Sequence, residues 1–257
     1  AVAADNGGKF EITGLPDDDY NVWVRGNCFE DSDPITARPS KKSQQIHVRN
    51  AAAEWTVPNK DDWNHRWACS DITSSNVSGL DVAWTRDIAA TTSYGAFASM
   101  PIIADGKMYI QDLNSNIAAL DLETGAELWT INYDEPVIGP NGLNLQDGVL
   151  YGVTRTTVFA LDAADGSELW REDVLTGGRH FSIAPAVHDG RVYAGSITRA
   201  NGGIIFALDA SSGSTVWTFN TLLDPTVIPP DNAAGGVWYT PPVDLNGDVY
   251  YGTGNAY

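Results

Sequence analysis

The sequence is poor in cysteine. Two of its 257 residues are cysteines, Cys28 and Cys69, and they form neither a CxxC pair, nor a CxxCH haem-attachment motif, nor a Cys/His spacing typical of metal ligands. These absences argue against a thiol-ligated metal or a covalently attached haem in this stretch. The two thiols can form one disulfide or stay reduced, and the sequence leaves both states open.

The sequence is also poor in cations and in long apolar runs. Acidic residues outnumber basic ones by 33 to 15, which gives a formal net charge of −18. Nucleic acids and anionic membranes bind basic surfaces, so we predict neither as a partner. No apolar run approaches the roughly 18 residues of a membrane-spanning helix, so no membrane-spanning segment is predicted. The first residues, AVAADNGGKF, have neither an initiator Met nor a secretory leader, and we expect them to lie inside a longer protein.

Three copies of one eleven-residue phrase organise the chain. They read ALDLETGAELW, ALDAADGSELW and ALDASSGSTVW and begin at residues 119, 160 and 207, which are 41 and 47 residues apart. Repetition at this period indicates one supersecondary unit per copy. In each copy Ala-Leu-Asp ends an apolar strand, a polar turn reverses the chain at a glycine, and the next strand ends on a tryptophan. The residues 76–84, NVSGLDVAW, predict an earlier strand that ends on Trp84.

A second repeat alternates with the first. ADGKMYI, QDGVLYG, HDGRVYA and NGDVYYG begin at residues 104, 146, 188 and 246, and each places Asp-Gly or Asn-Gly between strand-like runs, which is a strong hairpin signal. Each unit then holds four short strands in roughly 45 residues, the blade of a β-propeller. The predicted fold class is all-β, with four-stranded antiparallel blades. About three and a half blades are present, and since propellers need more to close, we expect part of a seven- or eight-bladed ring.

Residues 1–50 follow another pattern. Apolar residues alternate with polar ones on both sides of a turn at residues 14–18, which predicts two antiparallel strands, around Ile12 and around Val22, with one more strand at residues 45–48. This stretch resembles the closing part of a carboxypeptidase-regulatory-like module, an immunoglobulin-type domain. The resemblance implies a partial β-sandwich.

The chain is therefore predicted to contain three regions. They are the partial sandwich at residues 1–50, a Trp-rich linker at residues 51–75, and propeller repeats at residues 76–257. The linker contains Trp55, Trp63 and Trp67, which we expect to pack across the junction between the two modules.

The ALD phrase, together with hairpins such as DGRVYAG, resembles the tryptophan-docking repeat of the quinoprotein alcohol dehydrogenase superfamily, whose propellers bind pyrroloquinoline quinone (PQQ). The resemblance covers about residues 76–257. It implies a periplasmic or secreted bacterial oxidoreductase that uses PQQ and Ca²⁺ to oxidise an alcohol or polymer substrate, with cytochrome c as electron acceptor. The same repeat also builds non-enzymatic propellers, such as assembly scaffolds and sensor domains, so a protein- or polymer-binding scaffold is the alternative. A glycan-binding module, implied by the N-terminal resemblance, is a third interpretation.

The last stretch, residues 235–257, is similar to a segment of quinoprotein dehydrogenases in which a Trp forms the floor under the quinone and an Asn oxygen binds calcium. Carried over, the resemblance makes Trp238, preceded by Gly235 and Gly236, the cofactor platform, and makes Asn255 the calcium ligand. A flat cofactor suits a flat aromatic surface, and a hard cation prefers oxygen donors. In this scheme calcium polarises a quinone carbonyl while a carboxylate takes the alcohol proton.

The sequence departs from the family pattern in three places. The loop at residues 196–203 lacks the usual Glu ligand, residues 140–142 contain no adjacent Cys pair, and the family's Asp base belongs to a later blade, so no catalytic residue is assigned in this chain. PQQ carries three carboxylates, so an acidic chain needs local cations to bind it. The candidates, from corresponding inter-strand loops, are Arg155, Arg179 and Arg199, with His180 beside the second.

Overall fold

The structure, a computed structural model, describes residues 11–23, 35–40, 54–60, 66, 68, 70–89, 92–197, 202–221, 235–244 and 247–254. The chain divides into two compact units, Ala1–Ala53 with Ala68–Asp71 and Glu54–Trp67 with Ile72–Tyr257, and each is described by itself. Strands dominate the described residues, which contain no α-helix and one short 3-10 helix, η1 (Val77–Gly79). No helix in this described part is long and apolar enough to cross a membrane.

The first unit contains one described pair of strands. β1 (Tyr20–Val22) runs antiparallel to β2 (Ile35–Ala37). The strand predicted around Ile12 is not formed: residues 11–13 have no regular structure, and the Ile12 side chain is exposed and so has no apolar surface to pack against. The strand predicted at residues 45–48 lies outside the described residues, and the sandwich module stays a prediction.

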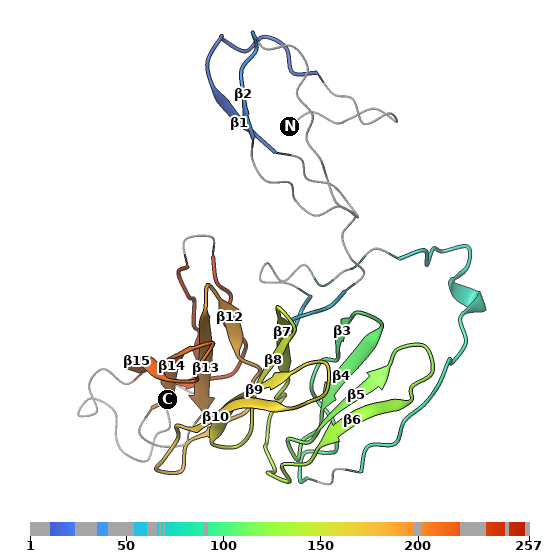
Figure 1. The fold of residues 1–257 in the computed structure, drawn as a ribbon, viewed down its shortest axis with the longest axis vertical. Helices are drawn as coiled ribbons and strands as arrows, with labels where there is room; N and C mark the ends of the chain where they lie inside the picture. Colours follow the sequence, from blue (N-terminus) through green and yellow to red (C-terminus); the bar gives the residue numbers. More distant parts are fainter. Residues whose placement is uncertain are drawn as a thin grey trace. The chain divides into compact units, whose positions relative to one another are not determined.

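The second unit contains two four-stranded antiparallel sheets and one five-stranded sheet, and each has a blade of four strands in chain order (Figure 1). The first blade comprises β3 (Ile102–Ala104), β4 (Lys107–Gln111), β5 (Ile117–Asp121) and β6 (Glu127–Ile131). The second blade comprises β7 (Leu143–Gln146), β8 (Val149–Val153), β9 (Thr157–Asp162) and β10 (Glu168–Asp173). The third blade comprises β12 (Ala186–His188), β13 (Arg191–Ile197), β14 (Ile204–Asp209) and β15 (Thr215–Asn220), and the short strand β11 (His180–Phe181) also pairs with β13. The predicted blade is confirmed.

A fourth blade begins after the third. β16 (Gly236–Val237) pairs with β17 (Thr253–Gly254), and a bridge joins Val243 to Val249 across the fourth predicted hairpin. In the three complete blades the Asp-Gly turns have positive φ at both residues, for example 50° at Asp105 and 70° at Gly106. This is the geometry of a type I′ turn, which matches the twist of the strands it joins. The chain therefore forms part of a propeller, as the repeats predict.

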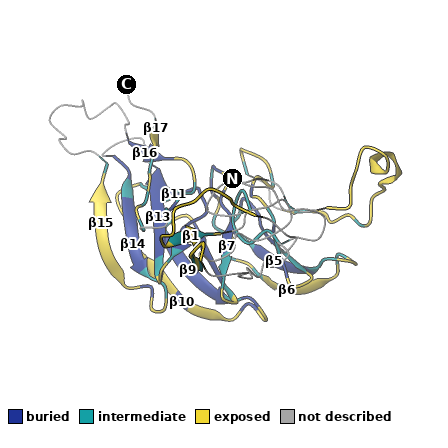
Figure 2. Ribbon diagram, turned by 90° about the horizontal axis from the view of Figure 1, so that it is seen from above, coloured by how far each residue is buried: buried dark blue, intermediate teal, exposed yellow. Residues whose placement is uncertain are grey.

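The core lies between blades. Apolar side chains of β4 and β5 pack against those of β8 and β9 in one buried cluster, and those of β8 and β9 pack against β13 and β14 in another. The outermost strands β6, β10 and β15 are mostly exposed, whereas β5, β9 and β14 are mostly buried (Figure 2). Each blade is thus stabilised mainly by apolar burial against its neighbours.

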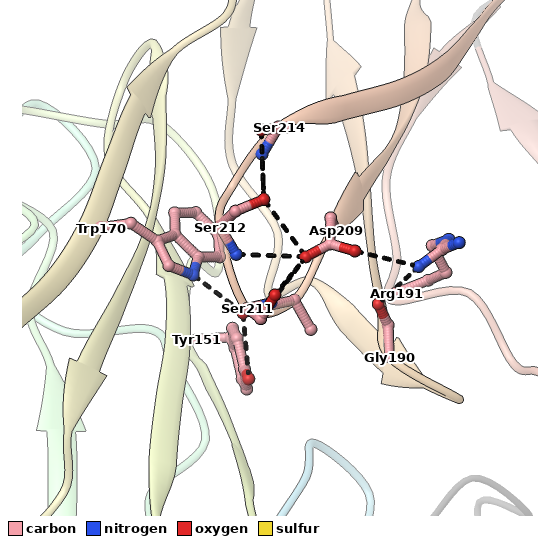
Figure 3. Close-up of polar contacts among 9 residues, drawn as sticks. Tyr151, Trp170, Gly190, Arg191, Asp209, Ser211, Ser212 and Ser214 are labelled. Carbon is pink, nitrogen blue, oxygen red and sulfur yellow. Dashed lines mark hydrogen bonds and ion pairs between the residues drawn. The ribbon is translucent and has the colours of Figure 1, made fainter.

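Three successive tryptophans each dock on the turn of the following blade. The indole N–H groups of Trp84, Trp129 and Trp170 donate to the carbonyl oxygens of Leu122, Ala163 and Ala210 at 3.0, 3.3 and 2.8 Å. The last of these junctions is drawn in Figure 3. At the first junction, the predicted strand ending at Trp84 is not formed with the described residues. A glycine of the repeated phrase lies beneath each indole. A Cβ atom added to Gly125, Gly166 or Gly213 would lie 2.5, 2.8 or 2.6 Å from the nearest atom of that indole. These glycines are therefore needed both for positive φ, as predicted, and for close approach.

A pair of glycine substitutions separates those two requirements. Gly148 and Gly166 have φ values of 77° and 78°, but an added Cβ meets nothing within 4 Å at Gly148 and lies 2.8 Å from the Trp129 ring at Gly166. We expect Gly148→Ala to lower the free energy of unfolding by about 1–2 kcal/mol. Gly166→Ala should lower it by about 1–3 kcal/mol more, because the indole must move. Urea unfolding measures both, and equal losses would contradict the docking role of Gly166.

The Asp of each phrase holds its turn. Asp209 Oδ1 accepts hydrogen bonds from the hydroxyl and backbone N–H of Ser211 and of Ser212, and its Oδ2 accepts from Arg191 at 3.3 Å. The Ser211 hydroxyl is the main cause of a lowered pKa at Asp209, and the Thr124 hydroxyl lowers the pKa of Asp121 in the same way. Each carboxylate thus stabilises the fold in its ionised form.

Acidification should therefore weaken the propeller. Because the folded-state pKa of Asp209 is depressed, its stabilising contribution is present above the unfolded pKa of about 3.9 and is lost as pH falls through the folded value. We expect Asp209→Asn to be less stable than the wild type at pH 7 and to approach it between about pH 4 and pH 2. Thermal unfolding across this range measures the gap. Asp147→Asn, in a turn that suits Asn equally, is the control for loss of charge, and a constant gap for Asp209→Asn would refute the linkage.

Candidate functional site

Trp238 lies directly after β16, beside a strand pair made largely of glycine. Gly236 is opposite Gly254 in the β16–β17 register. An added Cβ would lie 2.9 Å from Trp238 Cδ1 at Gly254 and 3.2 Å from Trp238 Nε1 at Gly236. The pyrrole side of the indole therefore lies against backbone, while 39% of the residue remains exposed. An aromatic ring held on one side and open elsewhere is the arrangement that a planar stacking ligand requires.

The neighbouring glycines hold this platform in place. Gly235 has a φ of 81°, and its N–H donates to the Gly254 carbonyl at 3.1 Å. The Thr221 hydroxyl lies 2.7 Å from the Gly235 carbonyl and 3.1 Å from that of Gly203. A Cβ added to Gly203 would lie 2.5 Å from the Gly235 carbonyl oxygen. Gly235 and Gly236 thus position Trp238 by allowing backbones to approach closely.

Of the predicted arginine candidates, Arg155 and Arg179 lie within the described residues, and the structure places them at different junctions. Arg179 Nε donates to the carbonyl of Gly202 at 3.1 Å, and Gly202 adjoins the Gly203–Gly235 contact. Arg179 is half-buried, and its contact with Gly202 places it next to the Gly203–Gly235 contact, three residues before Trp238. Arg155 is exposed, and its guanidinium donates to the Pro136 carbonyl at 3.5 Å, at the preceding junction. Arg179 is therefore the stronger cation candidate.

Of the other predicted site residues, only His180 lies within the described part of the chain. His180 begins β11, opposite Ile197 of β13, and is half-buried beside Arg179. Asn255 and Arg199 lie outside the described residues, as do both cysteines. Within the described part of the chain no group of three or more His, Cys, Asp or Glu side chains could hold a metal ion. The described donors thus do not by themselves fit a calcium site.

Sequence reasoning missed a set of linked loops that lead into the innermost strands. The Thr240 hydroxyl donates to the Ala184 carbonyl at 2.9 Å, which ties the fourth blade to the third. A Cβ added to Gly142 would lie 3.5 Å from the Cβ atoms of both Ala184 and Ser99. The small residues at these positions bring the loops of all four blades together. Aligning the residues that precede each hairpin turn would have revealed the pattern.

A further missed contact comes from the predicted linker. Trp55 exchanges two backbone hydrogen bonds with Ile103 of β3, at 2.7 and 2.8 Å, and the Thr56 carbonyl accepts from the N–H of Leu145 in β7 at 2.7 Å. The Trp55 indole N–H donates to the Met100 sulfur at 3.1 Å. Trp55 therefore belongs to the propeller unit, where residues 54–57 connect the innermost strands of two blades. Packing of the linker tryptophans across the module junction stays a prediction.

A groove of about 380 Å³ lies between the second and third blades, and Trp238 is not one of its lining residues. Its lining includes Tyr151 and Trp170, which dock on the Ala210 carbonyl (Figure 3). Its charged groups, Arg191 and Asp209, are paired with each other. We interpret this groove as a seam between docked blades.

Comparison with known proteins agrees with the propeller. Residues 113–234 match a family model described as outer membrane protein assembly factor BamB, and residues 55–143 match one described as glucose/ethanol/alcohol dehydrogenase, beta-propeller domain. The chain is 30% identical over 202 residues to a quinohemoprotein alcohol dehydrogenase of Comamonas testosteroni, covering 68% of this chain and 28% of that protein. It is 30% identical over 167 residues to a 1-butanol dehydrogenase (cytochrome c) of Thauera butanivorans, covering 60% and 23%.

The solved structures agree as well. The crystal structure of the Comamonas testosteroni enzyme superposes with a TM-score of 0.69 at 25% identity, over 79% of this chain and 35% of that one. The matched part spans about a quarter of the length of the relatives. The repeats, the docked blades and these matches support one conclusion: the chain forms part of a β-propeller of the PQQ-repeat type, the fold of the quinoprotein dehydrogenases that it matches.

Proposed function

We propose that this propeller binds PQQ on Trp238 and serves an oxidoreductase that oxidises an alcohol. The observation that carries the proposal is the half-exposed indole held against Gly236 and Gly254. The similarity to quinohemoprotein alcohol dehydrogenase and 1-butanol dehydrogenase supports it. The activity of the whole protein is part of the proposal, because the chain covers only a fraction of those relatives.

Each residue of the site would have a distinct task. Trp238 would stack on the planar cofactor, and Gly235 and Gly236 would keep the indole in place. PQQ, when bound, supplies a quinone that accepts hydride from the alcohol. Arg179 would face one of its carboxylates, which requires a cation because the chain carries a net charge of −18. Asn255 is proposed as a calcium ligand that needs further donors from outside the described residues.

The remaining features of the proposal are the substrate, the electron acceptor and the cellular location. They are an alcohol or polymer substrate, a cytochrome c acceptor and a periplasmic or secreted location. The relatives' names support an alcohol and cytochrome c. The group that removes the alcohol proton is not assigned to any residue of this chain.

A non-catalytic scaffold is the second candidate function. The model described as outer membrane protein assembly factor BamB matches residues 113–234, a longer stretch than the dehydrogenase model. This match covers the second half of the first blade and the whole of the second and third blades, and it ends before Trp238. The match therefore supports the shared propeller architecture, and it says nothing about a cofactor site at Trp238.

Trp238 should be required for PQQ binding. We expect PQQ, titrated with calcium present, to quench tryptophan fluorescence saturably in the intact natural protein. Trp238→Ala should weaken binding by about tenfold or more, because the stacking surface is removed. Trp23→Ala is the control, since Trp23 is also exposed, at 55% against 39%, but belongs to the first unit. Absence of saturable quenching in the folded wild type would refute the PQQ proposal and favour the scaffold.

Arg179 should contribute more to PQQ binding than Arg155. We expect Arg179→Gln to raise the dissociation constant about tenfold, since a charge-assisted contact with a carboxylate is lost, and to reduce the dependence of binding on salt. Arg155→Gln removes the same charge from an exposed position and should leave binding unchanged. Fluorescence titration at two salt concentrations measures both effects, and equal losses in the two variants would mean that only net charge matters.

A further inference from the structure

Three buried side chains at the loops between the first three blades each have an oxygen atom without a hydrogen bond. Gln111 ends β4, Asn141 lies just before β7, and Ser182 directly follows β11. Their exposed fractions are 1%, 1% and 0%. Among the described residues, no group forms a hydrogen bond with Gln111 Oε1, Asn141 Oδ1 or Ser182 Oγ. These three atoms are therefore removed from bulk water without a partner from the described chain.

The two amide side chains converge on one turn of the first blade. Gln111 Nε2 donates to the Ser115 carbonyl at 3.4 Å and to the Val153 carbonyl at 2.9 Å. Asn141 Nδ2 donates to the Asp112 carbonyl at 2.8 Å, and the Ser115 N–H donates to that same carbonyl at 3.0 Å. Both amide nitrogens thus face carbonyl oxygens, which can only accept, so the opposite atom of each amide is the oxygen. The two unpaired oxygens belong to one junction at residues 112–115.

Ser182 reaches this junction from the loop that enters the third blade. A Cβ added to Gly139 would lie 2.6 Å from Ser182 Cβ and 3.3 Å from its Oγ. The Gly139 carbonyl in turn accepts a hydrogen bond from the Asn141 N–H at 2.8 Å. The Ser182 hydroxyl therefore lies beside the loop that carries Asn141.

The chemistry of the three groups selects the ligand that would complete them. Leaving a buried donor or acceptor unpaired is costly, and native proteins rarely do so. Two amide oxygens only accept, whereas a hydroxyl both donates and accepts. The carboxylate in this turn, that of Asp112, already accepts hydrogen bonds from Asn114 and Asn116. The remaining set is neutral and short of donors, which suits water, with its two O–H groups and two lone pairs, better than a cation.

We propose that the junction formed by Gln111, Asn141 and Ser182 is a binding site for ordered water. The water donates to the two amide oxygens and exchanges a hydrogen bond with the Ser182 hydroxyl, which matches the roughly three hydrogen bonds that a buried water makes. It bridges the first blade to the loops that enter the second and third blades. Ile183, which follows Ser182, packs with Val237 in one buried cluster, so the bridged loop supports the strand that precedes Trp238.

The sign of one stability change tests this site. If the Ser182 hydroxyl is unpaired in the folded protein, Ser182→Ala removes a desolvation penalty and raises the urea midpoint of the intact natural protein. If the hydroxyl binds water, the substitution removes a partner from that water and lowers the midpoint, which is the result we expect. Ser99→Ala is the matched control. The buried Ser99 hydroxyl donates to the Gln111 carbonyl at 2.6 Å, so its loss lowers the midpoint in either case.

A raised or unchanged midpoint for Ser182→Ala, beside a lowered one for Ser99→Ala, would overturn the proposal. A crystal structure of the intact natural protein provides the second readout. We expect electron density for water within about 3.2 Å of Ser182 Oγ and of at least one of the two amide oxygens. A metal ion at this position, or protein groups that pair with all three oxygens directly, would overturn the proposal. The site rests on hydrogen bonding between blades alone, so a failed PQQ titration would leave it standing.

Discussion

The docking of a tryptophan on a glycine of the next blade is the interaction on which the rest of the structure depends. At three successive junctions the indole N–H donates to a turn carbonyl, and the absence of a glycine side chain lets the ring approach the backbone. The contact satisfies a buried donor and buries a large apolar surface at the same time. It therefore sets both the spacing and the order of the blades.

The candidate site uses the same physical device. Trp238 lies against Gly236 and Gly254, and Gly203 allows the Gly235 carbonyl to approach, so a platform for a planar ligand is built from close backbone packing. The chain is strongly acidic, so the proposed anionic cofactor would need a local cation such as Arg179. Fold and site thus share one constraint: neither tolerates side chains at these glycines.

The sequence predicted candidate residues for the site but could not rank them. Arg155 and Arg179 occupy corresponding inter-strand loops and look alike in the sequence. Only the folded chain shows that Arg179 contacts Gly202, next to the Trp238 platform, whereas Arg155 contacts Pro136. Trp55 is similar: it was expected at the module junction, and its backbone pairs with Ile103 in the propeller unit. Such contacts depend on which loops meet, and local patterns contain no information about that.

By itself the sequence determined the blade, because a hairpin turn, an Ala-Leu-Asp strand and a following strand that contains tryptophan are each encoded within a few neighbouring residues. It determined the four-strand repeat and the glycines that require positive φ for the same reason. The tertiary structure alone decided where a docking tryptophan packs: the Trp170 indole donates to the Ala210 carbonyl, 40 residues further along the chain, and Trp170 is 9% exposed. Such burial is a property of contacts between segments far apart in the chain, which a local pattern does not contain.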